Sequence, residues 1–184
     1  HRVIYVGTVS KTLSPTMRIG YLVVPPQFQD LFATAKQVVD RHTSMSDQIA
    51  LASLIESGIY ERHVRKIRRQ NSARREILLR SLRNEFGAHA SISGANAGLH
   101  VVVWFHQVQI EHEADFIEAA KELGVGVYSV GPLYEPGTAE RQSGVGIVIG
   151  YAALSQRQIE SRVSALKKAV ERLRKRKANA LKSG

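Results

Sequence analysis

One short segment near the start of the chain places a lysine and an arginine among several hydroxyl side chains. It runs Tyr5-Val-Gly-Thr-Val-Ser-Lys-Thr-Leu-Ser-Pro-Thr-Met-Arg-Ile-Gly-Tyr21, with Lys11 and Arg18 separated by seven positions and Thr8 and Ser10 beside them. A lysine amine can condense with an aldehyde, while a guanidinium and hydroxyl groups can hold a phosphate. These residue types together suit a phosphorylated aldehyde. By residue type alone, an exposed hairpin turn without chemistry remains the simpler interpretation.

Two segments with high β-strand propensity flank the lysine and the arginine and must hold them in place. Residues 3–6 and 19–24 are apolar and flank the polar turn, which predicts a strand, a loop and a second strand. Pro25 and Pro26 end the second run, because proline cannot donate to a strand ladder. Lys11 lies just past the first strand, so its amine can project from a rigid base.

The exact string resembles a known cofactor segment. Ser10-Lys-Thr-Leu-Ser-Pro-Thr-Met-Arg-Ile-Gly-Tyr21 closely resembles the pyridoxal-phosphate lysine segment of fold-type I aminotransferases. More narrowly, it resembles the aminotransferase-like domain of the MocR subfamily of GntR transcription regulators. The resemblance implies that Lys11 forms the internal aldimine with pyridoxal 5'-phosphate and that Arg18 binds the cofactor phosphate. It places Thr8 and Ser10 as neighbours of the phosphate and the lysine.

The resemblance covers nearly the whole chain and implies its organisation. The expected fold is α/β, with the end of the large pyridoxal-phosphate-dependent transferase domain in residues 1–70 and a small α+β C-terminal domain in residues 71–184. The implied function is that of a partial cofactor-binding effector domain of a transcription regulator. An amino compound would be the effector, an upstream winged-helix domain would bind DNA, and the intact protein would be a homodimer. His1 opens almost directly into a strand, without a methionine or a leader, so we expect a large block to precede it.

Two other functions stay open. One is an aminotransferase in which Lys11 carries the proton. Enzymes of this kind hold the substrate carboxylate with an arginine near the strand before the last helix, but residues 145–151 contain none, and the nearest arginine is Arg141 in the preceding loop. This absence argues against ordinary transamination, and we do not expect this part alone to be catalytically competent. The other is a catalytically silent, basic interaction module.

Hydrophobic periodicity predicts the remaining elements. Helices are expected over residues 28–41, 46–57, 60–86 and 111–123, and a last helix from the capping box Ser155-x-x-Gln158. Strands are expected over residues 88–92, 99–105, 125–130 and 144–151, which gives the order β-β-α-β-β-α after Gly87. Asn71 interrupts the apolar stripe of the long helix, so its amide needs a hydrogen-bond partner.

Composition narrows the class of protein. The chain has 184 residues, 43% of them hydrophobic, with a net charge of +10 and no cysteine, which excludes disulfides and thiolate metal sites. The absence of cysteine also fits a cytoplasmic protein, which is what we expect. No apolar run is long enough to cross a membrane. The arginines of the 60–86 helix and the basic tail could contact DNA, but without interleaved aromatic residues we favour solvated helix faces. The glycines of residues 144–150 lie in a strand rather than before a helix, and the histidines lack accompanying carboxylates, so neither a dinucleotide nor a metal site is expected.

Overall fold

The computed structural model describes residues 2–96, 98–134 and 144–183, with side chains described as far as residue 175. The chain divides into two compact units, His1–Arg69 and Gln70–Gly184. One helix, α3 (Ile59–Phe86), begins in the first unit and ends in the second.

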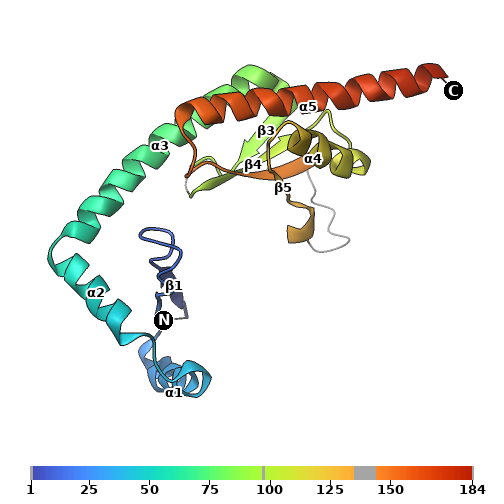
Figure 1. Cartoon of the computed structure of the whole chain (residues 1–184). Coiled ribbons are helices and arrows are strands. Elements are labelled where there is room, and N and C mark those ends of the chain that lie inside the picture. Colours follow the sequence, from blue (N-terminus) through green and yellow to red (C-terminus); the bar gives the residue numbers. More distant parts are fainter. Residues whose placement is uncertain (1, 97, 135–143, 184) are drawn as a thin grey trace. The chain divides into compact units, whose positions relative to one another are not determined.

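The first unit consists of a hairpin followed by helices (Figure 1). Strands β1 (Tyr5–Thr8) and β2 (Gly20–Val23) pair antiparallel, with Tyr5 opposite Val23 and Thr8 opposite Gly20. A short 3-10 turn, Pro26–Phe28, leads into α1 (Gln29–Asp40), which is followed by α2 (Met45–Glu56) and the start of α3. The predicted strand-loop-strand and both helices are therefore present, with ends shifted by one or two residues.

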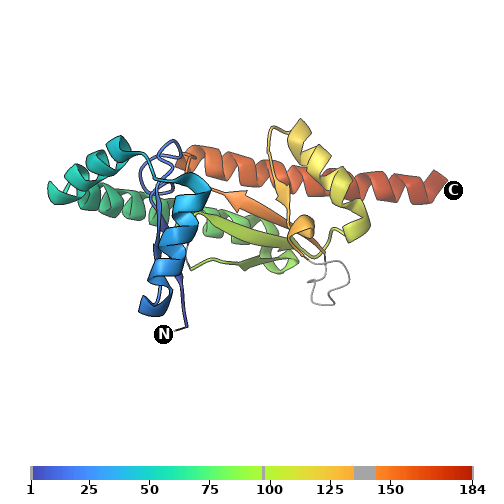
Figure 2. The same ribbon diagram turned by 90° about the horizontal axis from the view of Figure 1, so that it is seen from below.

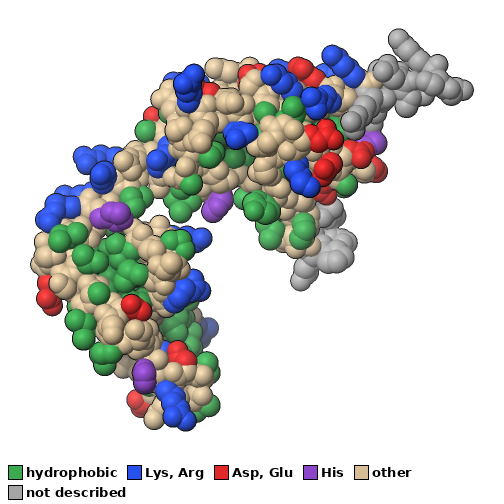
Figure 3. Space-filling model, in the orientation of Figure 1, with side chains coloured by type: hydrophobic (Ala, Val, Ile, Leu, Met, Phe, Trp, Pro, Cys, Tyr) green, Lys and Arg blue, Asp and Glu red, His purple; other side chains and the backbone are tan. Residues whose placement is uncertain are grey.

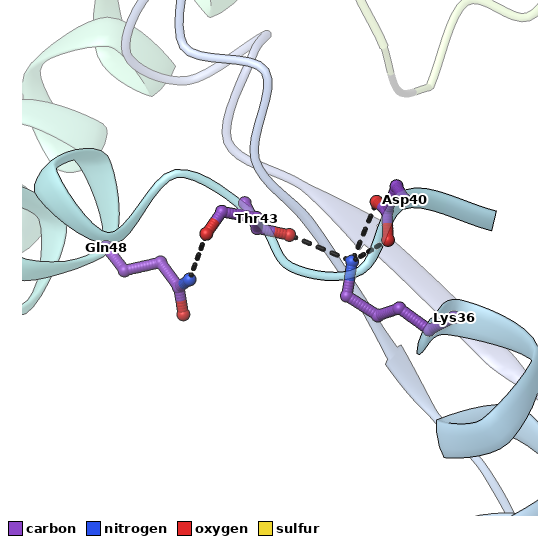
Figure 4. Close-up of polar contacts among 4 residues, drawn as sticks. All are labelled: Lys36, Asp40, Thr43 and Gln48. Carbon is purple, nitrogen blue, oxygen red and sulfur yellow. Dashed lines mark hydrogen bonds and ion pairs between the residues drawn. The ribbon is translucent and has the colours of Figure 1, made fainter. Parts of the chain in front are cut away.

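Polar contacts fasten the corner between α1 and α2 (Figure 4). The Lys36 amine donates to both carboxylate oxygens of Asp40, at 2.9 and 3.0 Å, and to the Thr43 hydroxyl at 3.0 Å. The side-chain amide of Gln48 donates through Nε2 to the Thr43 backbone carbonyl at 3.1 Å. These groups are exposed, so the contacts set the geometry of the corner more than they stabilise it.

Much of the apolar surface of the first unit is open (Figure 3). Val38 and Val39 on α1 are 80% and 83% exposed, and Ile49 on α2 is 63% exposed. Among the described apolar side chains of this unit, Val9 and Ile19 reach the buried class alongside Pro25. The apolar stripe predicted for α1 is present, but no described residue buries it.

The second unit is built on a four-stranded antiparallel sheet (Figures 1 and 2). Its strand order is β3 (Ala90–Ser93), β4 (His100–Phe105), β6 (Val145–Gly150) and β5 (Tyr128–Ser129). With α4 (Glu113–Glu122) and α5 (Gln156–Ser183), it gives the predicted order β-β-α-β-β-α. The strand expected over residues 125–130 pairs only at Tyr128 and Ser129.

The core of the second unit lies between one sheet face and three helices. Alternate residues of β4 and β6 point toward this core, because successive side chains of a strand lie on opposite faces. The core contributions of α3 are Leu78, Leu82 and Phe86, and Phe116 of α4 is fully buried. Its ring centroid lies 5.2 Å from that of Phe105. Helix α5 contributes its regular apolar stripe, which includes Ile159, Val163, Leu166, Val170 and Leu173.

Two local predictions are met by specific hydrogen bonds. The Ser155 amide donates to Gln158 Oε1 at 2.8 Å, and the Gln158 amide donates to Ser155 Oγ at 3.3 Å, which is a reciprocal capping box. Asn71 is 9% exposed, and its amide oxygen accepts a hydrogen bond from Arg74 at 3.0 Å. The arginine one turn later therefore satisfies the polar group in the apolar stripe.

Candidate functional site

The loop between β1 and β2 holds Lys11 and Arg18 on a base closed by two hydrogen bonds. The Val9 amide donates to the Ile19 carbonyl at 3.1 Å, and the Ser10 hydroxyl donates to the Met17 carbonyl at 2.7 Å. Ser10 precedes Lys11 and Met17 precedes Arg18, so these bonds bring together the backbone segments from which the two cations emerge.

Lys11 itself lies in a helical turn. The amides of Thr12 and Leu13 both donate to the Val9 carbonyl, at 3.0 and 2.9 Å. The Lys11 and Arg18 side chains are exposed, and neither forms a hydrogen bond or ion pair with any described residue. The amine and the guanidinium are thus both free to meet an external ligand.

The hydroxyls of Thr8 and Ser10 brace this loop. Thr8 Oγ1 donates to the Ile19 carbonyl at 3.2 Å and accepts from the Ser10 amide at 3.2 Å. A hydroxyl has one proton, and in both side chains it is directed at a backbone carbonyl. In this arrangement the two residues shape the loop, while Lys11 and Arg18 carry the free donors.

Helix α3 supports the loop through Tyr60, a contact that sequence reasoning missed. The Tyr60 hydroxyl lies 3.1 Å from Thr12 Oγ1. Thr12 already donates to the Val9 carbonyl at 3.2 Å, so Tyr60 is the donor in this pair. In the sequence, Tyr60 is simply the first residue of the helix predicted over residues 60–86, and helical periodicity does not reveal a partner 48 residues away.

Two tyrosines, one from each strand, lie together on the hairpin. The ring centroids of Tyr5 and Tyr21 are 5.9 Å apart, and the Tyr21 ring crosses Gly7 so closely that a Cβ there would lie 2.2 Å from it. A hydrogen bond with Tyr5, followed by the charge interaction with Tyr5, raises the pKa of Tyr21 above its ordinary value. A tyrosine is already protonated at neutral pH, and the raised pKa extends the protonated range of Tyr21 to higher pH.

The strand before the last helix carries no arginine. On the sheet face away from the helices, β4 presents Trp104, whose ring lies against Gly146 and 6.1 Å from the Tyr134 ring. Val148 follows Gly146 on the same face. Arg141, the nearest arginine in sequence, lies outside the described residues. Among the described residues, no group of histidines and carboxylates has the arrangement of a metal site.

The donor set of the loop fits a phosphorylated aldehyde. A free amine can receive a carbonyl carbon, and a free guanidinium can hold a phosphate through two parallel hydrogen bonds. The two groups emerge from adjacent backbone segments held by a closed loop base.

Among curated proteins, the sequence is similar to transcription regulators. No protein-family model matches the chain. It is 34% identical over 168 residues to the uncharacterized HTH-type transcriptional regulator YhdI of Bacillus subtilis, covering 91% of this chain and 34% of the relative. It is 30% identical over 168 residues to the probable rhizopine catabolism regulatory protein MocR of Rhizobium meliloti, covering 91% and 33%. The chain is an aminotransferase-like segment of the MocR type. It spans about a third of the length of these curated relatives.

Aminotransferases share this segment. The MocR-type chain is 28% identical over 171 residues to the 2-aminoadipate transaminase of Thermus thermophilus, covering 93% of the chain and 41% of the enzyme. Among solved structures it matches LysN, the alpha-aminoadipate aminotransferase of Thermus thermophilus complexed with N-(5'-phosphopyridoxyl)-L-leucine. That match has a TM-score of 0.74 at 27% identity and covers 93% of this chain and 42% of LysN. The aromatic aminotransferase Aro9 of C. albicans shares the fold at 20% identity and a TM-score of 0.84, covering 95% of this chain and 40% of Aro9. None of the described helices combines the length and the apolarity needed to cross a bilayer.

Proposed function

We propose that this MocR-type chain is part of the pyridoxal-phosphate-binding effector domain of a transcription regulator. The observation that carries the proposal is the closed loop base, which sets an amine and a guanidinium on adjacent backbone segments. Neither group has a hydrogen-bond or ion-pair partner among the residues that the structure describes. When bound, pyridoxal phosphate supplies an electrophilic carbonyl and an electron-withdrawing ring. Lys11 is the residue that would attach it covalently, and Arg18 would bind its phosphate.

Each residue of the loop has a separate task in this proposal. The Lys11 amine provides the nucleophile, and the Arg18 guanidinium balances the phosphate charge in a geometry that lysine cannot reproduce. Ser10 and Thr8 hold the loop in shape through the carbonyls of Met17 and Ile19. Either hydroxyl could instead turn toward the phosphate, but it would then give up a bond that closes the loop.

The wider organisation of the protein is also proposed. Residues 1–70 would belong to the large cofactor domain and residues 71–184 would form the small domain. The exposed apolar side chains of α1 and α2 support this division, because these side chains would be buried by the rest of the large domain in the intact protein.

The partners of the intact protein are proposed as well. An upstream domain would bind DNA, the intact protein would be a homodimer in the cytoplasm, and an amino compound would act as the effector. Its binding would shift the population between two packings of the small domain.

A second candidate is an aminotransferase. The similarity to a transaminase of known activity supports it. Residues of β6 argue against it, since Gly146 and Val148 offer no cationic group to a substrate carboxylate. Turnover of an amino donor to a keto acid by the complete protein would favour the enzyme.

Covalent trapping tests the proposal. The complete protein would be mixed with pyridoxal phosphate, reduced with borohydride and digested, and the modified lysine would be located by mass spectrometry. We expect modification at Lys11, its loss in Lys11→Ala and its retention in Lys66→Ala, which removes an exposed lysine of α3. Arg18→Gln should weaken cofactor binding about tenfold or more, whereas Arg68→Gln should not. Equal modification of wild type and Lys11→Ala would refute the assignment.

A further inference from the structure

A second candidate site lies within the second unit, apart from the Lys11 loop. A cavity of about 300 Å³ opens at the β5 edge of the sheet, between the sheet and helices α3 and α5. Its walls are mostly apolar and include Leu78, Val127, Ile149, Ile159, Val163 and Leu166. A cavity of this size and lining is at the lower end of the range that binds small molecules.

The cavity exists because one strand ladder stops early. Strand β5 pairs with β6 only through Tyr128 with Val148 and Ser129 with Ile147. If the ladder continued, Gly126 would face Gly150, but the Gly126 backbone forms no hydrogen bond with any described residue. The segment before β5 therefore leaves β6, and backbone polar groups as well as apolar side chains border the opening.

One cation stands at this opening. Arg162 of α5 lines the cavity and is exposed, and its guanidinium crosses Gly124, where an added Cβ would lie 2.8 Å from Nη1. Gly124 has a φ of +74°, so both its conformation and the guanidinium above it favour glycine. Arg162 forms no ion pair with any described carboxylate, so its donors are available to a ligand.

We propose that this cavity binds a small carboxylate with an apolar tail. The carboxylate would pair with Arg162 at the opening, and the tail would lie against the aliphatic walls. Charge complementarity selects an anion, and the apolar lining selects a hydrocarbon chain over a sugar or a nucleotide. The site contains neither Lys11 nor Arg18, so it is separate from the proposed cofactor site.

Calorimetric titration of the chain with 4-methylpentanoate tests this site. The control ligand is 4-methylpentanamide, which has the same apolar tail but no charge.

Two variants test the cation and the apolar cavity separately. Arg162→Gln removes the cation, with Arg157→Gln as its control, since Arg157 lies on the same helix, is exposed and does not line the cavity. Gly126→Leu fills the cavity, and a Cβ at Gly126 meets no atom within 4 Å, so the variant should fold.

We expect saturable binding of the carboxylate in the millimolar range or tighter, and binding of the amide at least about tenfold weaker. Arg162→Gln should lose about tenfold or more, Gly126→Leu should lose binding, and Arg157→Gln should match wild type. Thermal unfolding of each variant verifies that it is folded. Absence of binding to the wild-type chain, or equal binding by wild type and Arg162→Gln, would overturn the proposal. Neither result depends on pyridoxal phosphate, so the proposed function is tested independently.

Discussion

The hydrogen bond between Tyr60 and Thr12 leads to a quantitative prediction about the lysine loop. Tyr60→Phe removes only the hydroxyl that donates to Thr12 Oγ1 at 3.1 Å and keeps the ring. A neutral hydrogen bond contributes about 0.5–1.5 kcal/mol net. At about 1.4 kcal/mol per factor of ten, the opening equilibrium of the loop should increase about two- to twelvefold.

Native-state hydrogen exchange measures this opening directly. The amides of Thr12 and Leu13 donate to the Val9 carbonyl within the turn that carries Lys11, so their protection reports on the loop. Tyr60→Phe should speed their exchange by the factor above, and amides of the second unit's core should be unaffected.

Tyr128→Phe is the matched control, because Tyr128 is 78% exposed and lies in the second unit. It removes the same group without touching the loop. If Tyr60→Phe leaves the Thr12 and Leu13 amides unchanged, or if Tyr128→Phe changes them equally, helix α3 does not support the lysine loop through this bond.

Four further predictions follow from described contacts. Phe116→Ala should destabilise the second unit by about 3–5 kcal/mol in denaturant unfolding, because a fully buried ring is removed, whereas exposed Glu118→Ala should cost little. Gly146→Ala should lower the melting temperature, since its Cβ would lie 2.5 Å from Val130 Cγ2 and 2.6 Å from the Trp104 ring, while Gly126→Ala should not. Ser155→Ala should cost about 0.5–2 kcal/mol through the loss of the helix cap, seen as faster exchange of the Gln158 amide. The raised pKa of Tyr21 means that folding favours its protonated form. The resulting contribution to folding stability is therefore present at neutral pH and is lost as the pH rises through the tyrosine range. Tyr5→Phe should lower the pKa of Tyr21, which a titration followed by phenolate absorbance would show.

Some features of this fold follow from short-range pattern. The long helix was predicted over residues 60–86 and occupies Ile59–Phe86, and the strand predicted over residues 99–105 occupies His100–Phe105. The capping box needed only two residues three positions apart. Each of these features depends on backbone propensity and on neighbours within a turn or a strand, which a sequence lists directly.

Other features depend on what lies across the fold. The strand expected over residues 125–130 is short because, within this segment, only Tyr128 and Ser129 pair with β6, and alternating hydrophobicity cannot say where a ladder stops. Periodicity likewise showed that α1 has an apolar face, but not that Val38 and Val39 lack cover among the described residues. A pattern specifies that a face is apolar, whereas its burial depends on which surface meets it.

For the candidate site, the sequence by itself determined the chemical groups: a lysine, an arginine seven positions later, and hydroxyls between strands. Only the tertiary structure decided how they are used. It directs the protons of Thr8 and Ser10 to backbone carbonyls and brings Tyr60 to the loop from 48 residues beyond Thr12. It leaves Lys11 and Arg18 without a hydrogen-bond or ion-pair partner in the part of the chain that the structure describes. The physical reason is that a hydroxyl can bond to many partners, and the closure of the hairpin and the packing of α3 select the one that it meets.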